Sequence, residues 1–194
     1  STYNDFSGTD SGTNDITTPG DVGLTGSGIL YDKLYVFKKW SIHRVTYTGS
    51  TPLLDIKQAK STVGTASPRS IKNVDIPGHG EVLMFLGTDR RIYIFDGFSS
   101  TAVSDNMLIN NGISTVYFKN INTQALDKVH AVYYSDRGWY ELFVPMGSST
   151  KPDFSILVDI TRQPFAFWPY SNRNFMSSAV SDNGAGQRVI YVQH

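Results

Sequence analysis

Short apolar stretches alternate with short polar turns along most of this chain. The apolar stretches are rich in Tyr, Phe, Val, Ile and Thr, which suit the pleated, half-buried surface of a β-strand. Apolar residues at the 3.6-residue spacing of a helix almost nowhere continue beyond two turns. The pattern therefore predicts an all-β protein built from hairpins.

Four segments share one plan, in which an apolar strand, a polar turn and a second apolar strand follow one another at residues 34–45, 83–95, 131–144 and 178–192. They recur roughly every 48 residues, and further strand candidates lie between them at 70–74, 155–160 and 165–168. Four short antiparallel strands per repeat are typical of a β-propeller blade, so we expect about four blades. They form either a small ring or part of a larger propeller. A β-sandwich is the alternative fold.

Two of the predicted strands are apolar at every position rather than at alternate ones. Leu83–Leu86 and Ile92–Phe95 are continuous runs. A sheet with one face in water would alternate, whereas a blade has both faces covered by its neighbours. These runs therefore favour stacked blades, although a sandwich core would also accommodate them.

The chain divides into two parts by composition. Residues 1–28 are rich in Gly, Ser, Thr and Asp and are expected to form a loop or linker, and residues 29–194 carry the blades. The absence of an initial methionine favours a fragment of a longer chain. One helical pattern, at residues 122–129, begins at Asn122, which we expect to act as its N-cap.

Composition narrows the classes of function. Lys plus Arg and Asp plus Glu each total 17, so the formal net charge is zero and no long-range attraction to nucleic acid or an anionic membrane is expected. The chain contains no cysteine, which excludes disulfides and thiolate chemistry. No apolar run reaches the roughly 20 residues of a membrane span, and residues 1–28 lack a signal-peptide pattern.

Two loop motifs were candidates for chemistry. Asp10–Asp15 has oxygen ligands near the spacing of a calcium loop, but the later bidentate glutamate is missing, so a polar loop is the better interpretation. The Ser-Asp-x-Gly turns at 135–138 and 181–184 invite comparison with the Asp boxes of sialidase propellers. Trp139 directly follows the first of these turns instead of standing two or three residues later. Ordinary hairpin-turn chemistry explains both turns.

The remaining candidates are single side chains and one cluster. The histidines share no short metal-ligand spacing, so surface or strand positions are expected for His43, His79, His130 and His194. A catalytic carboxylate pair cannot be chosen among Asp55, Asp75, Asp89, Asp96, Asp136 and Asp159, most of which lie in or beside predicted turns. The aromatic residues in Phe165–Tyr170 could stack on sugars or bases, but a place in the core is the more common one. Lys38 and Lys39 are expected in a solvated turn. We therefore predict no catalytic, cofactor-binding or metal-binding residues.

An ordered series of segments resembles the propeller-type structural proteins of tailed bacteriophages, which are found in tail tubes and nozzles. The series comprises Leu30–Lys38 (LYDKLYVFK), Ser41–Val45 (SIHRV), Val63–Ile71 (VGTASPRSI), Leu83–Leu86 with Ile92–Gly97, Lys128–Tyr134 and Val158–Ile160. The resemblance covers about residues 28–192. Members of this family are much longer, which leaves open which blades this chain contains.

This resemblance implies a virion protein without a cofactor. Such a protein would form a ring with other copies of itself around the DNA exit channel and would contact neighbouring tail or connector proteins. The sequence leaves open whether the ring also makes non-specific contact with DNA in the channel. It would be assembled in the host cytoplasm, and no residues with a chemical function are carried over. The leading hypothesis is thus a structural subunit and not an enzyme. The alternative is a secreted or surface propeller that binds or hydrolyses carbohydrate.

Overall fold

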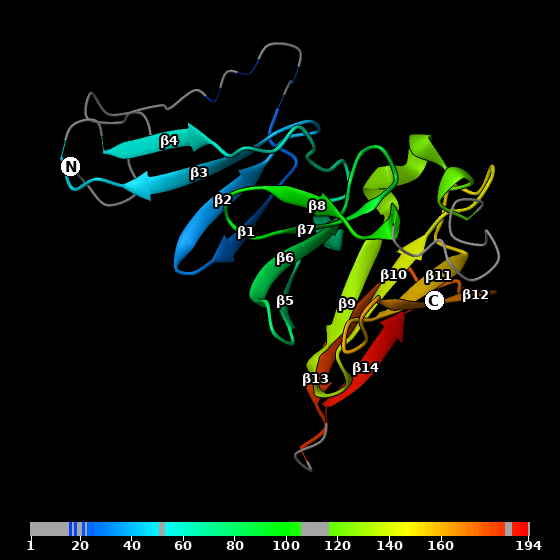
Figure 1. The fold of residues 1–194 in the computed structure, drawn as a ribbon. Helices are drawn as coiled ribbons and strands as arrows, with labels where there is room; N and C mark the ends of the chain where they lie inside the picture. Colours follow the sequence, from blue (N-terminus) through cyan, green and yellow to red (C-terminus); the bar gives the residue numbers. More distant parts are fainter. Residues whose placement is uncertain are drawn as a thin grey trace.

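The computed structural model describes residues 16, 18, 21, 23–50, 53–105, 117–184 and 188–193 of the 194-residue chain. Over these residues the protein is all-β, with fourteen strands in four antiparallel sheets (Figure 1).

The first sheet comprises β1 (Gly26–Leu30), β2 (Lys33–Phe37), β3 (Ile42–Tyr47) and β4 (Leu54–Gln58). The second comprises β5 (Lys72–Ile76), β6 (Gly80–Leu86), β7 (Ile92–Phe95) and β8 (Ser100–Ala102). The third comprises β9 (His130–Tyr134), β10 (Trp139–Val144), β11 (Phe154–Asp159) and β12 (Ala166–Ser171). The fourth is the hairpin of β13 (Ser177–Asp182) and β14 (Arg188–Gln193).

Each four-stranded sheet is a meander in which the strands pair in chain order. The sheets follow one another in a row, and the first strand of each sheet contacts the first strand of the next (Figure 1). The prediction of an all-β fold with repeated antiparallel four-stranded units is therefore confirmed for three units. No sheet is closed on itself in the described part of the chain.

The second sheet is covered on both faces. On β6, Met84 and Leu86 belong to the core between the second and third sheets, whereas Leu83 and Phe85 belong to the core between the first and second. All four of these side chains are fully buried. Burial on both faces explains the continuous apolar run, because successive side chains of a strand point to opposite faces.

The third sheet packs against the second through one face. Tyr140, Leu142 and Val144 on β10 lie in the core shared with the second sheet and are completely buried. The residues between them, including Phe143, therefore lie on the opposite face. The start of the β13–β14 hairpin covers part of that opposite face, because β13 contacts β9 and Phe175 packs edge-on against Phe143 at 5.6 Å between ring centroids.

The four hairpins read from the sequence are not equivalent units. The first two, at 34–45 and 83–95, are the second and third strands of their sheets, whereas those at 131–144 and 178–192 are the first and second. Asp89 therefore lies in the turn between the second and third strands of its sheet. Asp136 and Asp182 lie at the turns between the first and second strands of theirs, so only these two occupy equivalent positions. The sequence pattern misplaced the repeat because β1 (GSGIL) and β5 (KNVDI) each carry only two large apolar side chains, so the more strongly apolar hairpins were taken as the start of each unit.

The segment before the second sheet contains buried polar residues whose hydrogen bonds join neighbouring elements. The Thr65 hydroxyl donates to the Leu86 carbonyl at 2.7 Å, and the Ser67 hydroxyl donates to the Leu126 carbonyl at 2.7 Å. Ser70, in the short helix η1 (Pro68–Ser70), accepts from the Tyr140 hydroxyl on its carbonyl at 2.8 Å. Each of these three polar residues is at most 1% exposed, so satisfied hydrogen bonds are essential there.

Two other expectations concern local structure. The helical pattern at 122–129 forms a 3₁₀ segment, η3 (Thr123–Lys128), and Asn122 caps it as expected by accepting from the Gln124 amide at 3.0 Å. A further 3₁₀ turn, η4 (Ser135–Arg137), connects β9 and β10. The linker expected at residues 1–28 overlaps the start of β1, which begins at Gly26.

Candidate functional site

The face of the third sheet that points away from the second sheet carries a row of aromatic side chains. Tyr134 on β9 lies opposite Trp139 on β10, and Trp168 and Tyr170 follow at alternate positions of β12. Residues directly opposite in antiparallel strands share a face, which places these four rings on one side of the sheet. Trp168 is 37% exposed and Tyr170 38%. We call this set the aromatic surface.

Arginine side chains lie over three of these rings. The contacts are Arg137 over Trp139 at 4.8 Å, Arg173 over Tyr170 at 4.9 Å and Arg162 over Trp168 at 5.7 Å from the ring centroid. A guanidinium over an indole or phenol ring gains about 0.5–1 kcal/mol at an exposed site. Each arginine lies in a turn or loop that follows or precedes a strand, so the local chain path brings the charge over the ring.

One of the arginines is fixed by a carboxylate. Arg162 donates to Asp159 at 3.0 Å, and Asp159 also accepts from the amide and the hydroxyl of Thr161. Burial works against the charged form of Asp159, but the hydrogen bonds from Thr161 and Arg162 outweigh it and lower the pKa of this carboxyl. Asp159 therefore orients Arg162 and remains ionised.

A second carboxylate, Glu141, lies on the same side of the sheet as the aromatic surface. It sits opposite Leu157, is 6% exposed and accepts from the Ser155 hydroxyl at 2.7 Å. Glu141 and Asp159 are diagonal neighbours on β10 and β11, and each accepts hydrogen bonds from different residues. Both are nearly as buried as the core, however, so a substrate cannot reach them in this arrangement.

A stacked pair lies beneath the start of the β13–β14 hairpin. His130 stacks on Phe143 with ring centroids 4.8 Å apart, and His130 is 3% exposed. Burial lowers the pKa of His130 to about 4. Its Nε2 atom has no hydrogen-bond partner among the described residues, whereas Nδ1 lies 3.5 Å from the Lys128 carbonyl. His130 is therefore a neutral packing residue at neutral pH.

A polar cluster at the first sheet contains serine, histidine and aspartate but not in a catalytic order. The Ser41 hydroxyl donates to Asp21 at 2.7 Å and lies 3.1 Å from His43 Nε2, which also contacts Thr18. In a catalytic triad the histidine stands between the other two residues, whereas here the serine does. Ser41 is 1% exposed, so its hydroxyl cannot attack a substrate.

Hydrogen bonds of this cluster instead hold residues before β1 against the β2–β3 turn. Asp21 also accepts from the backbone amides of Lys39 and Trp40, and the Lys38 ammonium donates to the Ile16 carbonyl at 2.7 Å. Burial and the charge of Lys38 lower the pKa of His43. The expectation that Lys38 is solvated was wrong, because Lys38 is 3% exposed, whereas Lys39 is exposed.

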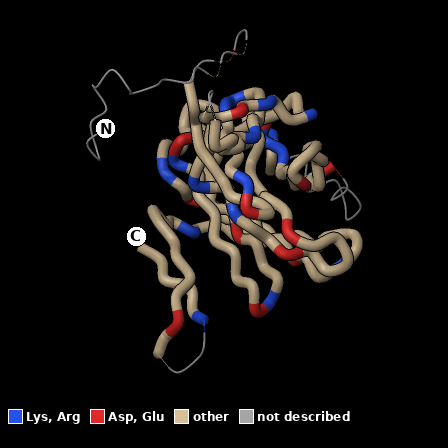
Figure 2. The backbone as a smooth tube through the Cα atoms, turned by 90° about the vertical axis from the view of Figure 1, so that its left-hand side faces the viewer, with Lys and Arg blue, Asp and Glu red and all other residues tan. Residues whose placement is uncertain are grey.

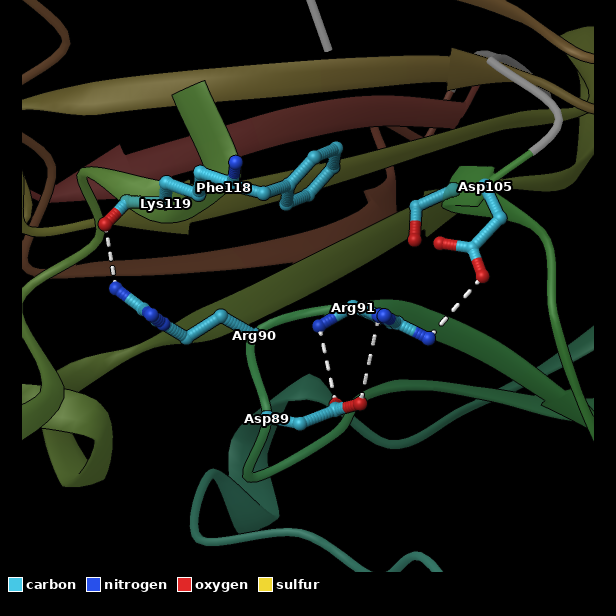
Figure 3. Close-up of a pocket in the computed structure, with 7 residues that line it drawn as sticks. Asp89, Arg90, Arg91, Asp105, Phe118 and Lys119 are labelled. Carbon is cyan, nitrogen blue, oxygen red and sulfur yellow. Dashed lines mark hydrogen bonds and ion pairs between the residues drawn. The ribbon is translucent and has the colours of Figure 1, made fainter. Parts of the chain in front are cut away.

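A small cavity of about 240 Å³ lies between the β6–β7 turn, the end of β8 and residues 118–119 (Figure 3). Three of its charged residues are paired with one another, and a fourth donates to a backbone carbonyl. Arg91 contacts Asp89 at 3.7 Å and Asp105 at 3.2 Å, and Arg90 donates to the Lys119 carbonyl. These contacts join the β6–β7 turn to Asp105 and Lys119. We therefore interpret the cavity as a contact between turns and not as a ligand-binding site.

The other candidate carboxylates have separate partners. Asp55 pairs with Lys57 at 2.9 Å, Asp136 lies 3.7 Å from Arg188, and Asp96 accepts from the amides of Phe98 and Ser99. Asp75 is an exposed residue of β5. The structure therefore brings none of these four to another of the six candidates through a hydrogen bond or ion pair recorded for the described residues.

The aromatic segment at 165–170 divides between the two faces of β12. Phe165 and Phe167 pack against the core, as the sequence favoured, and Trp168 and Tyr170 form part of the aromatic surface. Sequence reasoning missed Glu141 and the three stacked arginines. A single charged residue within the apolar strand at 139–144 was the one available signal for Glu141.

The remaining candidates complete the comparison with the sequence. His79 is exposed in the β5–β6 turn, and Asp10–Asp15 and His194 lie outside the described residues. Among the described residues no group of three or more histidines and carboxylates is placed to hold a metal ion, and no helix has the length and apolar character to cross a membrane. A comparison with models of protein families found no match, and neither did a comparison with curated proteins.

Proposed function

We propose that this chain is a structural subunit in which β-propeller blades form part of a ring. The observation that carries the proposal is the stacking of successive four-stranded meanders, with the second sheet buried on both faces. A blade is covered by its two neighbours in this way, and the first strands then lie together near the axis. The contacts of β1 with β5, of β5 with β9 and of β9 with β13 support that arrangement.

The proposal extends to the tail or nozzle of a bacteriophage, with copies arranged around the DNA exit channel and in contact with neighbouring tail or connector proteins. Its basis is the resemblance of the ordered segments, several of which have packing roles. Thr65, Ser67 and Ser70 in one such segment join sheets through hydrogen bonds. Acidic and basic residues are interspersed over the described part of the chain (Figure 2), so any contact with channel DNA would be local and non-specific.

The test is the composition of purified phage particles from the source that encodes the chain. We expect the protein in gradient-purified particles at a fixed ratio to the capsid subunit, measured by quantitative mass spectrometry. Detection only in the soluble fraction of the lysate, with none retained in particles, would contradict the proposal. A capsid protein and a host cytosolic protein serve as the positive and negative controls.

A second candidate function is carbohydrate binding, which the exposed rings of Trp168 and Tyr170 favour. Sugar rings stack on such aromatic side chains, and Arg173 beside them would suit an acidic sugar. Affinity electrophoresis in polysaccharide gels tests this function with Trp168→Ala. Trp40→Ala is the matched control, because Trp40 is 48% exposed but lies in the β2–β3 turn. Retardation lost only in Trp168→Ala would support this second function.

A further inference from the structure

A groove of about 530 Å³ lies where the outer strands of the first sheet meet the β7–β8 turn of the second. It is lined by Arg44 on β3, Lys57 on β4, Lys60 just after β4, and Gly97 and Phe98 in the turn. We call it the basic groove. Its two sides belong to neighbouring sheets of this chain, so a sheet stacked on the far face of the first sheet would leave the groove open.

Two cations stand directly opposite each other on the side formed by the first sheet. Arg44 is the register partner of Lys57 on β4 and of Tyr35 on β2. The Tyr35 ring packs edge-on against Phe95, so this is the face that points toward the second sheet. Like charges directly opposite each other destabilise a sheet. Asp55 lies 2.9 Å from Lys57 and offsets only part of this repulsion.

Arg44 differs from the other arginines of the chain. Each of the others donates a hydrogen bond, forms an ion pair or lies over an aromatic ring. Arg44 makes no such contact with any residue that the structure describes, although it is half-buried. Burial raises the pKa of the Tyr35 hydroxyl, and the charge of Arg44 opposes that rise. The guanidinium donors of Arg44 are therefore available to an anionic ligand.

Phe98 adds a flat apolar surface beside these charges. It is 64% exposed, although the turn that carries it is held firmly. The Asp96 carboxylate accepts from the amides of Phe98 and Ser99 at 2.8 Å each, and the Lys60 amide donates to the Phe98 carbonyl at 3.0 Å. The Lys60 ammonium lies 6.0 Å from the centre of the Phe98 ring. A fixed, exposed ring beside cations is suited to stacking on a nucleic-acid base.

We propose that the basic groove binds a nucleotide, free or within a single strand, with its phosphate between Arg44 and Lys57 and its base on Phe98. Guanidinium and ammonium groups bind phosphate well, and cations combined with an aromatic ring bind nucleotides without regard to base sequence. The volume lies within the range of about 300–1,000 Å³ that is usual for small-molecule sites. The groove is built from third and fourth strands, so it is separate from any DNA contact at the first strands.

Titration of isotope-labelled protein with adenosine monophosphate (AMP), followed by the chemical shifts of backbone amides, tests the site. We expect shifts at residues 57–60 and 97–99. AMP should bind at least about tenfold more tightly than ribose phosphate, which has the phosphate but no base to stack. A short oligoadenylate distinguishes the two sources of nucleotide, since tighter binding than AMP indicates a single strand and equal binding indicates a free nucleotide.

Substitutions separate the two parts of the site. Arg44→Gln should weaken AMP binding about tenfold through the loss of a charge-assisted contact. Phe98→Ala should weaken it by a similar factor through the loss of stacking. Arg137→Gln removes the same charge from the exposed β9–β10 turn, and Trp40→Ala removes an exposed ring from the β2–β3 turn, so both should leave the affinity unchanged. Lys60→Gln replaces Arg44→Gln if circular dichroism shows that Arg44→Gln is unfolded.

Three results would overturn the inference. One is the absence of shifts in the groove with both AMP and oligoadenylate. Another is equal affinity for AMP and for ribose phosphate or a polyglutamate peptide, which would show a site that recognises charge without a base. The third is equal weakening by Arg44→Gln and Arg137→Gln, which would show attraction to the protein as a whole and not to this groove.

Discussion

Replacing equivalent leucines in the first and second sheets measures how much the stacking of sheets stabilises this protein. Leu34 and Leu83 occupy corresponding positions on β2 and β6, but Leu34 is 40% exposed and Leu83 is fully buried between sheets. A fully buried leucine loses its transfer free energy and leaves a cavity, so Leu83→Ala should lower the free energy of unfolding by about 3–5 kcal/mol. Leu34→Ala loses only part of a side chain's burial and leaves no closed cavity, so about 0.5–1.5 kcal/mol is expected.

The assay is urea unfolding followed by circular dichroism and tryptophan fluorescence, at a concentration where the protein is monomeric. Both variants should keep the slope of the transition, so that the midpoints report stability. Equal losses within 0.5 kcal/mol (about the precision of such a comparison) would refute the reasoning, because the two leucines would then have the same environment.

Three further substitutions probe particular contacts. Tyr140→Phe removes the hydroxyl that donates to the buried Ser70 carbonyl and should cost about 1–3 kcal/mol in urea unfolding, while a loss below measurement error would show that this bond is unimportant. Because the pKa of His130 is about 4 when folded and 6.5 is its ordinary value, the unfolded chain takes up the proton first. Stability should therefore fall as the pH decreases from 6.5 to 4, and His130→Phe should remove that part of the loss; an unchanged pH profile would contradict the burial argument. Asp21→Ala removes the acceptor for Ser41 and two backbone amides, so limited proteolysis should cut before β1 faster, whereas Asp182→Ala at the hairpin turn should leave that rate unchanged.

The strands with strong apolar patterns were predictable from the sequence for a physical reason. Leu83–Leu86 is buried on both faces, so every position is apolar. The continuous apolar run therefore predicts burial of both faces directly. The phase of the repeat was not predictable, because β1 contains Gly26 and Gly28. Side chains of Ile71, Pro68 and Leu83 approach these two glycines closely, so the strand has little apolar signal of its own.

The aromatic surface shows what the sequence could not reveal. Trp168 and Tyr170 were visible as aromatic residues, but the arginines over their rings come from a turn and from the loop after β12. Their positions depend on the path of those connections, which periodicity does not encode. Similarly, Ser41 and His43 are separated from Asp21 by a strand hairpin, and only the packing of the preceding segment brings the three together.

The most direct test of the account is an electron cryo-microscopy map of the native assembly that contains this chain. The account predicts sheets arranged radially about an axis, with β1, β5, β9 and β13 innermost and with Ile29 and Leu34 of the first sheet, which are exposed in the isolated chain, covered by a neighbouring sheet. A map in which the first strands lie far from any common axis, or in which Ile29 and Leu34 face solvent, would contradict it.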